Sequence, residues 1–174
     1  MGSEMCIRDS SKERRGRSAP LNLVLTESNA TSSVGKLLPE LAGKLTGNSI
    51  RVPVANVSMA ILNLTLESAQ SREAVNEYLR EISLNSAKQR QVGYTISSEV
   101  VSSDFIGDRH AGVIDSHATI VDGRQVVLYV WYDNEFGYTC QVVRVAQKMA
   151  GIKYPVVPPQ PASDSSKMSL VSTG

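Results

Sequence analysis

The chain has 174 residues, of which 41% are hydrophobic and 20% charged, and its formal net charge is +1. These values are typical of one globular domain with tails, and the small charge argues against a nucleic-acid partner. No stretch approaches the roughly eighteen apolar residues that span a bilayer, and no charged segment followed by an apolar run indicates a secretory signal. We therefore expect neither a membrane nor a nucleic-acid partner.

The two ends of the chain lack the patterns found between them. Residues 1–10 show no periodicity, and we interpret them as a non-native leader. Residues 153–174 combine prolines with a serine-rich end, which predicts a disordered tail. Residues 11–152 are the predicted folded domain.

The first part of this domain contains a helix followed by a short strand. Apolar residues at helical spacing predict a helix from Thr31 to Leu45. Pro39 lies within it and predicts a kink or break. Residues 48–52 predict a strand that Pro53 ends or places at a sheet edge.

The middle of the domain predicts a strand and a surface helix. In residues 57–67 the second half alternates between apolar and polar, as in a strand with one buried face, whereas the first half is apolar on both faces and predicts fuller cover. Ser71 is a plausible N-cap, and an apolar stripe from Val75 to Ile82 then predicts a helix lying on the sheet.

A hairpin and a final helix follow. Residues 117–121 and 125–132 flank Asp122-Gly123, a pair that favours a type I′ turn, and the second of these strands is apolar enough to be central. Residues 136–149 predict a helix buried on a broad face and ending near Gly151.

The order of these elements favours one fold class. Helices alternate with hairpin-like strand pairs, which predicts an α+β domain with a mixed, largely antiparallel sheet and helices packed on one face. No glycine-rich phosphate fingerprint follows a predicted strand, so this segment is not itself a dinucleotide-binding domain.

Four residues are candidates for ligand binding. Arg51 ends a predicted strand, where its guanidinium could bind phosphate or could form a surface ion pair. Ser28 and Asn29 precede a predicted helix, where they could hold an anion or simply cap the helix. Asn134 follows the apolar strand, where its amide could pair with a carboxamide or act as an N-cap, a role for which Asp133 competes.

The remaining reactive side chains do not predict a catalytic or metal site. Cys140 lies on the apolar face of the last helix, where a buried thiol is a poor nucleophile. Asp104, Asp108, His110 and Asp115 could form an acid–base site, but their spacing equally suits a polar connection. With only two cysteines and no metal-ligand spacing, we expect a reducing compartment and no metal.

Several motifs in one order resemble those of glyceraldehyde-3-phosphate dehydrogenase, over about residues 14–151, in a form similar to a longer bacterial branch of that family. They are Arg15–Ala19, Val34–Leu41, Gly43–Gly47, Arg51-Val52-Pro53, Asn56-Val57-Ser58, Gly93-Tyr94-Thr95, Val100–Phe105 with Gly107-Asp108, and Trp131–Tyr138.

The resemblance implies an NAD-dependent aldehyde oxidation. In this family a cysteine thiolate attacks the aldehyde, a histidine acts as base, hydride passes to NAD, and phosphate releases an acyl phosphate. By alignment, the cysteine, the histidine and the nucleotide-binding domain all lie upstream of residue 1. The resemblance thus implies a catalytic-domain fragment that carries no catalytic residue and is inactive alone.

The resemblance also assigns roles to residues that are present. Arg51 matches the arginine that binds substrate phosphate and inorganic phosphate, and Asn134 matches the asparagine that contacts the nicotinamide. Ser28 and Asn29 match a threonine-glycine pair of the phosphate loop. Serine keeps the hydroxyl, whereas asparagine replaces a glycine, and Ser32 stands where lysine is usual.

The implied partners are glyceraldehyde 3-phosphate, inorganic phosphate, NAD with NADP as the alternative, and further copies of the chain in a cytoplasmic homotetramer. Two other functions remain open. One is a dehydrogenase for a related sugar-phosphate aldehyde, erythrose 4-phosphate, and the other is a catalytically inactive assembly or binding module.

Overall fold

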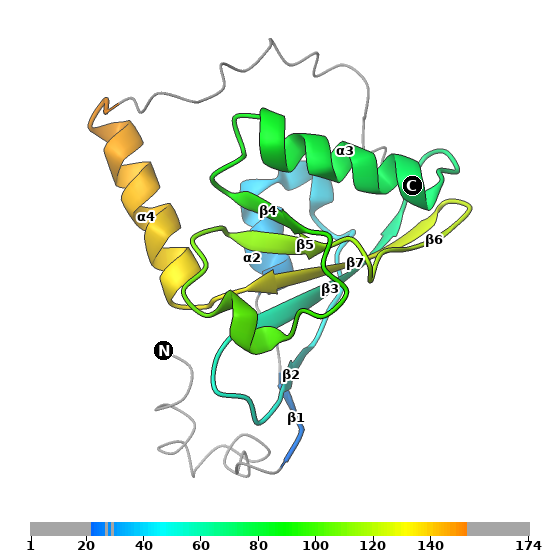
Figure 1. The fold of residues 1–174 in the computed structure, drawn as a ribbon, viewed down its shortest axis with the longest axis horizontal. Coiled ribbons are helices and arrows are strands. Elements are labelled where there is room, and N and C mark those ends of the chain that lie inside the picture. Colours follow the sequence, from blue (N-terminus) through cyan, green and yellow to red (C-terminus); the bar gives the residue numbers. More distant parts are fainter. Residues whose placement is uncertain (1–21, 27, 29, 153–174) are drawn as a thin grey trace. The chain divides into compact units, whose positions relative to one another are not determined.

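The computed structural model describes residues 22–26, 28 and 30–152, which fall into two compact units divided after Ala55 (Figure 1). The first unit contains β1 (Val24–Thr26), α2 (Ala30–Leu37), the 3₁₀ helix η2 (Pro39–Leu41) and β2 (Ser49–Arg51). The second contains β3 (Ser58–Thr65), α3 (Arg72–Asn85), β4 (Val92–Thr95), the 3₁₀ helix η3 (Ser102–Phe105), β5 (Gly112–Asp115), β6 (Ile120–Asp122), β7 (Gln125–Tyr132) and α4 (Phe136–Met149). The leader and tail predicted for the two ends lie outside the described residues.

The first unit joins a two-stranded antiparallel ladder to a helix that ends early. β1 pairs with β2, with Val24 opposite Arg51 and Thr26 opposite Ser49. α2 ends at Leu37, and the chain continues as η2 from Pro39. The predicted break at this residue is therefore confirmed. Its cause is that proline has no backbone N–H to continue the hydrogen bonds of the helix.

The second unit is built on a five-stranded sheet in the order β3-β7-β5-β4, with β6 also pairing with β7. β3 pairs with the whole of β7, from Ser58 opposite Tyr132 to Thr65 opposite Gln125. β5 and β6 pair with the two halves of the other edge of β7, also antiparallel, and only β4 and β5 run parallel. The predicted α+β class with a mixed, largely antiparallel sheet is confirmed, as is the central position of β7.

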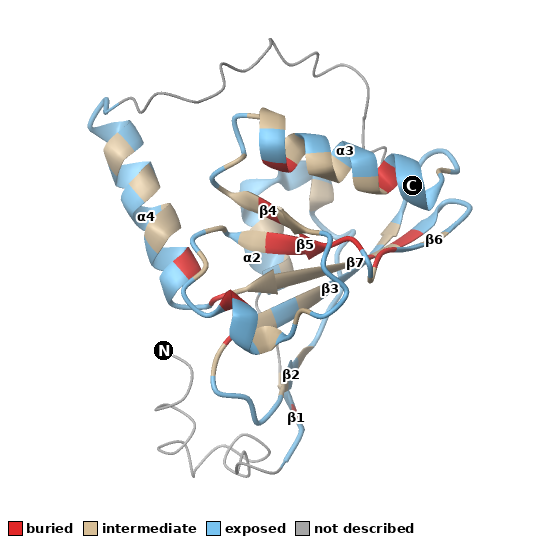
Figure 2. Ribbon diagram, viewed as in Figure 1, coloured by how far each residue is buried: buried red, intermediate tan, exposed pale blue. Residues whose placement is uncertain are grey.

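Helix α3 covers one face of this sheet. Its predicted N-cap is confirmed, because the Ser71 hydroxyl accepts a hydrogen bond from the N–H of Ala74 at 3.1 Å. Val75 packs with Leu66, Val126 and Leu128 in a buried cluster. Buried segments of α3 and of the sheet are red in Figure 2. Burial of this apolar stripe is what holds the helix on the sheet.

The opposite face has a smaller cluster around an aromatic pair. Phe105 of η3 stacks on Trp131 of β7, with ring centroids 5.3 Å apart and planes inclined by 13°. Val113, the register partner of Trp131, and Val57 complete the cluster. This packing fixes the η3 loop beside the end of β7.

The hairpin forms where it is predicted, but its turn differs. Asp122 pairs with Gln125, so the two-residue turn is Gly123-Arg124, one residue later than expected. Only Gly123 has a positive φ, of 58°, whereas a type I′ turn requires a positive φ at both central residues. Glycine at the first position is the requirement of a type II′ turn, which is the pattern observed.

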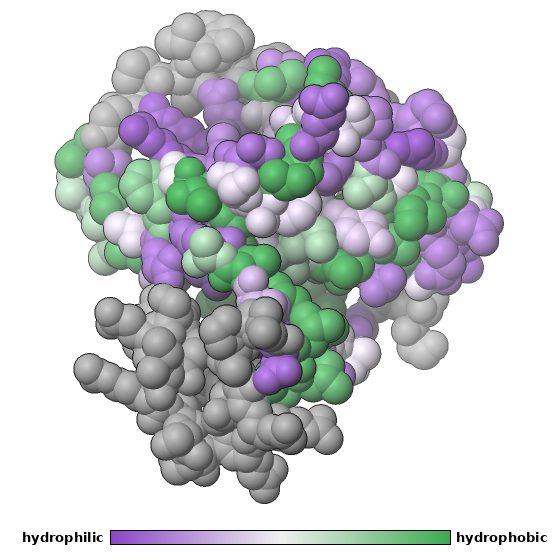
Figure 3. All heavy atoms as spheres, turned by 60° about the horizontal axis from the view of Figure 1, so that its bottom comes forward, coloured by the Kyte–Doolittle hydropathy of each residue, from purple (hydrophilic) through white to green (hydrophobic). Residues whose placement is uncertain are grey.

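Two elements are less buried than their sequence patterns predict. In β3 no residue is buried, and Met59, Ile61 and Leu62 are 42%, 52% and 42% exposed. In α4 only Gly137 is buried, so the broad buried face expected for this helix is wrong for the described chain. β3 has one neighbouring strand, and α4 extends from the end of β7 away from the sheet (Figure 1), which leaves apolar areas at the surface (Figure 3).

Candidate functional site

The predicted phosphate-binding residues lie at opposite ends of the β1–β2 ladder. Arg51 is half-buried and ends β2, opposite Val24 at the start of β1. Ser28 follows the other end of β1, just before α2 begins at Ala30. Both residues therefore lie in the first unit without sharing one end of the ladder. Asn29 is outside the described residues.

The hydroxyl of Ser28 is used locally as a cap. It accepts a hydrogen bond from the N–H of Ala30 at 3.2 Å, at the first residue of α2. A hydroxyl that accepts one bond keeps its own O–H as a donor. Capping the helix and donating to a phosphate oxygen are therefore compatible roles for Ser28.

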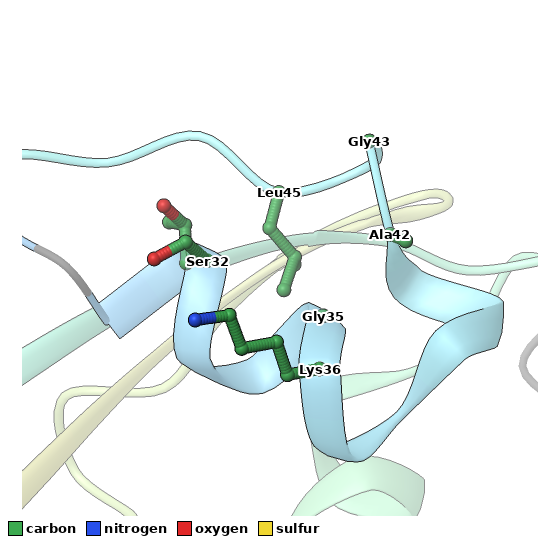
Figure 4. Close-up of a pocket in the computed structure, with 7 residues that line it drawn as sticks. Ser32, Gly35, Lys36, Ala42, Gly43 and Leu45 are labelled. Atoms are coloured by element: carbon green, nitrogen blue, oxygen red, sulfur yellow. The ribbon is translucent and has the colours of Figure 1, made fainter.

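A shallow hollow lies beside this helix (Figure 4). Its lining is polar on the α2 side, at Thr31, Ser32 and Lys36, and apolar at Ala42 and Leu45. The lysine that the family resemblance expects at position 32 is absent. Lys36, one helical turn further on, instead brings an ammonium to the same face of α2 (Figure 4).

Asn134 lies where the sequence predicts it, at the carboxyl end of β7 and just before α4. Its side chain is exposed and forms no hydrogen bond with another described residue. An asparagine amide has two donors and one acceptor, which match the acceptor and donors of a carboxamide. The chemistry of this position therefore fits the carboxamide of a nicotinamide ring.

Asp133, rather than Asn134, caps the start of α4. It is only 3% exposed. Its Oδ1 accepts hydrogen bonds from the N–H of Glu135 at 3.0 Å and the N–H of Phe136 at 2.8 Å. Its Oδ2 accepts from the N–H of Gly107 at 2.9 Å and from Asn56 Nδ2 at 3.2 Å. Asn56, Gly107, Asp133, Glu135 and Phe136 are called the Asp133 clamp below.

The clamp determines the charge state of this carboxyl group. Burial raises the pKa of Asp133, but hydrogen bonds from Gly107, Phe136, Glu135 and Asn56 together outweigh it, so the pKa lies below the ordinary value. The group is consequently a carboxylate that accepts every donor facing it. This ionised form is the one that can hold three separate chain segments together.

A strained residue adjoins the clamp. Val57 is 6% exposed and has a φ of 73°, a value that β-branched residues rarely adopt. Its N–H donates to Asn56 Oδ1 at 2.7 Å, while the Nδ2 of the same side chain donates to Asp133. Asn56 thus uses both ends of its amide to connect the strained residue to the clamp.

The acidic residues considered as an acid–base site are each used locally. Asp104 Oδ2 accepts from the N–H of Val101 at 2.8 Å, and Asp108 Oδ1 lies 2.8 Å from His110 Nδ1. Asp115 accepts from Trp131 Nε1 at 3.1 Å and from two nearby backbone N–H groups. These bonds support the interpretation as polar connections.

Three remaining observations concern reactive and membrane-related features. Cys140 is half-buried rather than fully buried on α4. Among the residues that the structure describes, no cluster of three histidine, cysteine or acidic side chains could hold a metal ion. None of the described helices is long and apolar enough to cross a membrane.

The sequence predicts Asn134 as a site residue but does not predict the clamp behind it. It indicates Asp133 only as a competing N-cap. Its partners Asn56 and Gly107 are 77 and 26 residues away in the sequence, so no local pattern could pair them. The available signal was an aspartate between an apolar strand and a helix, which indicates a buried cap but not its distant donors.

Comparison with known proteins gives consistent matches. Residues 3–134 match the family model for the glyceraldehyde 3-phosphate dehydrogenase C-terminal domain. A glyceraldehyde-3-phosphate dehydrogenase-like protein of Pseudomonas aeruginosa is 61% identical over 145 residues, covering 83% of this chain and 32% of that protein. The cytosolic glyceraldehyde-3-phosphate dehydrogenase of Craterostigma plantagineum is 41% identical over 146 residues, covering 83% and 43%. A glyceraldehyde-3-phosphate dehydrogenase of Borreliella burgdorferi is 40% identical over 138 residues, covering 78% of this chain and 41% of that protein.

These matches place the chain in a class of oxidoreductases, the dehydrogenases. More particularly, the chain belongs to the glyceraldehyde-3-phosphate dehydrogenase family and contains its C-terminal domain. The resemblance drawn from the sequence motifs is confirmed. The chain spans 32% to 43% of the length of the three relatives named above.

Proposed function

We propose that this chain is the catalytic domain of an NAD-dependent, phosphorylating glyceraldehyde-3-phosphate dehydrogenase. The reaction oxidises the aldehyde of glyceraldehyde 3-phosphate and transfers the acyl group to inorganic phosphate. The thiol nucleophile, the histidine base and most contacts to the cofactor come from residues outside this chain. This chain contributes contacts to phosphate and to the nicotinamide.

The observation that carries the proposal is the presentation of Asn134. Its exposed amide follows β7, and the preceding residue, Asp133, is anchored through its own buried carboxylate. Such an amide can both donate to and accept from the carboxamide of the ring. When bound, NAD or NADP supplies the hydride acceptor, and Asn134 is proposed to orient the ring rather than to take part in bond making.

Arg51, Ser28 and Asn29 are the proposed phosphate contacts. A guanidinium offers a charged fork of donors to phosphate oxygens, and Ser28 retains an O–H to donate while it caps α2. A hydrogen bond from a charged group contributes about 1.5–3 kcal/mol, compared with about 1 kcal/mol for a neutral one. Arg51 is therefore expected to dominate phosphate affinity.

The proposal extends to assembly and compartment. The exposed apolar residues Met59 and Ile61 of β3 are the kind of surface that another copy of the chain covers in a homotetramer. A cytoplasmic location is proposed from the similarity to a relative whose name includes cytosolic.

The test compares the 174-residue chain with the protein expressed from its complete coding sequence. NAD reduction is followed with glyceraldehyde 3-phosphate and phosphate, and separately with erythrose 4-phosphate. We expect no turnover by the 174-residue chain, because the family resemblance assigns the nucleophile and most of the hydride-acceptor site to residues outside it. We expect turnover by the complete protein, with the higher kcat/KM for glyceraldehyde 3-phosphate.

Two results would contradict this assignment. A higher kcat/KM for erythrose 4-phosphate would assign the domain to that related dehydrogenase. A complete protein that turns over neither aldehyde would identify an inactive assembly or binding module.

A further inference from the structure

We propose that the Asp133 clamp is a positioning device that fixes the turn carrying Asn134 for contact with the nicotinamide carboxamide. Asp133, Asn56 and Gly107 would act through Asn134 without touching the cofactor themselves. The inference rests on the proposed function and adds residues to which neither the sequence motifs nor the family match gives a role in cofactor binding.

The bonding pattern restrains the chain on both sides of Asn134. The residue before it, Asp133, is buried, and the two residues after it donate their N–H groups to the Oδ1 of that same carboxylate. The backbone at Asn134 is therefore bracketed by a ring of short hydrogen bonds. Its side chain is left exposed, as a ligand-facing group requires.

The second oxygen of the carboxylate connects this turn to two distant segments. Oδ2 accepts from Gly107, which follows η3 and has a φ of 80°, and from Asn56, which precedes β3. An ordinary N-cap needs only the nearby N–H groups of its own helix. The contacts to Gly107 and Asn56 therefore do more than start α4, since they set the position of the turn relative to the loop and to β3.

Backbone strain lies at the same place. Val57 keeps its positive φ while its N–H is held by Asn56, and the next residue, Ser58, pairs with Tyr132 at the end of β7. Strain of this kind persists where the surroundings determine the conformation, and it is often found at binding sites. Asn56 connects this strained backbone directly to Asp133.

A first experiment measures order at the turn in the 174-residue chain, without cofactor. Asp133→Asn keeps the shape of the side chain, but its amide NH₂ faces donors that need an acceptor. Asp115→Asn is the matched control, because Asp115 is also a buried carboxylate, 8% exposed, that accepts from two backbone N–H groups and Trp131. Amide hydrogen exchange is followed by NMR.

We expect Asp133→Asn to speed exchange at Glu135, Phe136 and Gly107 by about tenfold or more, the effect of losing about 1.4 kcal/mol of local stabilisation. Asp115→Asn should change these three sites less than its own neighbours His117 and Ala118. Equal exchange at the clamp sites in both variants would overturn the proposal, because the carboxylate would then not order the turn.

A second experiment measures cofactor affinity in the complete protein by calorimetry, together with KM values. We expect Asp133→Asn to raise the Kd and KM for NAD by about tenfold while the KM for phosphate stays within about twofold. Asn56→Ala removes one donor to Asp133 and the acceptor of the Val57 N–H, but it leaves the local cap of α4 in place, so it should raise the same two constants by a smaller factor. This second variant keeps the test decisive if Asp133→Asn folds poorly.

The proposed function and the role of the Asp133 clamp can be refuted separately. A wild-type complete protein that does not bind NAD would overturn the proposed function. A wild-type protein that binds NAD, with Asp133→Asn and Asn56→Ala binding it equally tightly, would overturn the clamp alone.

Discussion

Replacing Gly137 with alanine measures how closely the first turn of α4 approaches the loop before β5. Gly137 is buried, and a Cβ atom added there would lie 2.6 Å from the carbonyl oxygen of His110 and 3.5 Å from that of Asp108. Both obstacles are backbone atoms, and Asp108 holds this loop by accepting from the N–H of His110 at 2.8 Å. The loop cannot therefore move aside as a flexible side chain would.

Two opposing effects set the magnitude. Alanine in a helix is favoured over glycine by about 1 kcal/mol. Forcing an extra methyl group into a close contact costs about 1–3 kcal/mol. The net result for Gly137→Ala is a loss of up to about 2 kcal/mol in the free energy of unfolding. With a urea m-value of about 1–3 kcal/mol/M, the midpoint should fall by up to about 2 M.

Urea unfolding followed by the fluorescence of Trp131, the one tryptophan of the chain, provides the assay. Gly35→Ala in α2 is the matched control, because a Cβ there would meet Ala42 at ordinary contact distances of 3.4 Å or more. This control should not lower the midpoint. A Gly137→Ala midpoint above that of the wild type, as the helix propensity of alanine alone would give, would refute the close approach of α4 to the loop.

Three further predictions concern charge, assembly and the phosphate loop. The ionised Asp133 carboxylate, whose pKa is lowered in the folded state, stabilises the fold above about pH 4, and this stabilisation is lost as the pH falls further. The free energy of unfolding should therefore drop more steeply below about pH 4 for the wild type than for Asp133→Asn, and parallel curves would contradict this. The exposed Met59 and Ile61 predict self-association, which a monomer in sedimentation at tens of micromolar would disprove. In the complete enzyme, Ser28→Thr with Asn29→Gly should lower the KM for phosphate by roughly tenfold or less, and an increase would be inconsistent.

The sequence predicts the elements whose signals are local. The Ser71 cap and the end of α2 before Pro39 each follow from a residue acting on its immediate neighbours. The position of the hairpin is likewise predicted by its local sequence. The type of turn depends on whether Asp122 or Gly123 is its first central residue, and the strand register places Gly123 there. Burial was the less predictable property, because apolar periodicity shows that a face is apolar and not what covers it.

The same division applies to the site. The position of Asn134 could be predicted, because a polar residue after an apolar strand lies at the sheet edge where ligands gather. The clamp could not be predicted, because Asn56 and Gly107 meet Asp133 only through the register of β3 with β7 and the stacking of Phe105 on Trp131.

The most direct test of the account is the effect of Arg51→Ala on the complete enzyme, assayed against phosphate and glyceraldehyde 3-phosphate. Loss of a charged contact of about 1.5–3 kcal/mol predicts a fall of about ten- to hundredfold in kcat/KM. Arg80→Ala is the control, because that arginine pairs with Glu77 on the exposed side of α3. This substitution should leave kcat/KM unchanged for both phosphate and glyceraldehyde 3-phosphate. If Arg51→Ala also leaves both values of kcat/KM unchanged, Arg51 is structural and its proposed role in binding phosphate is contradicted.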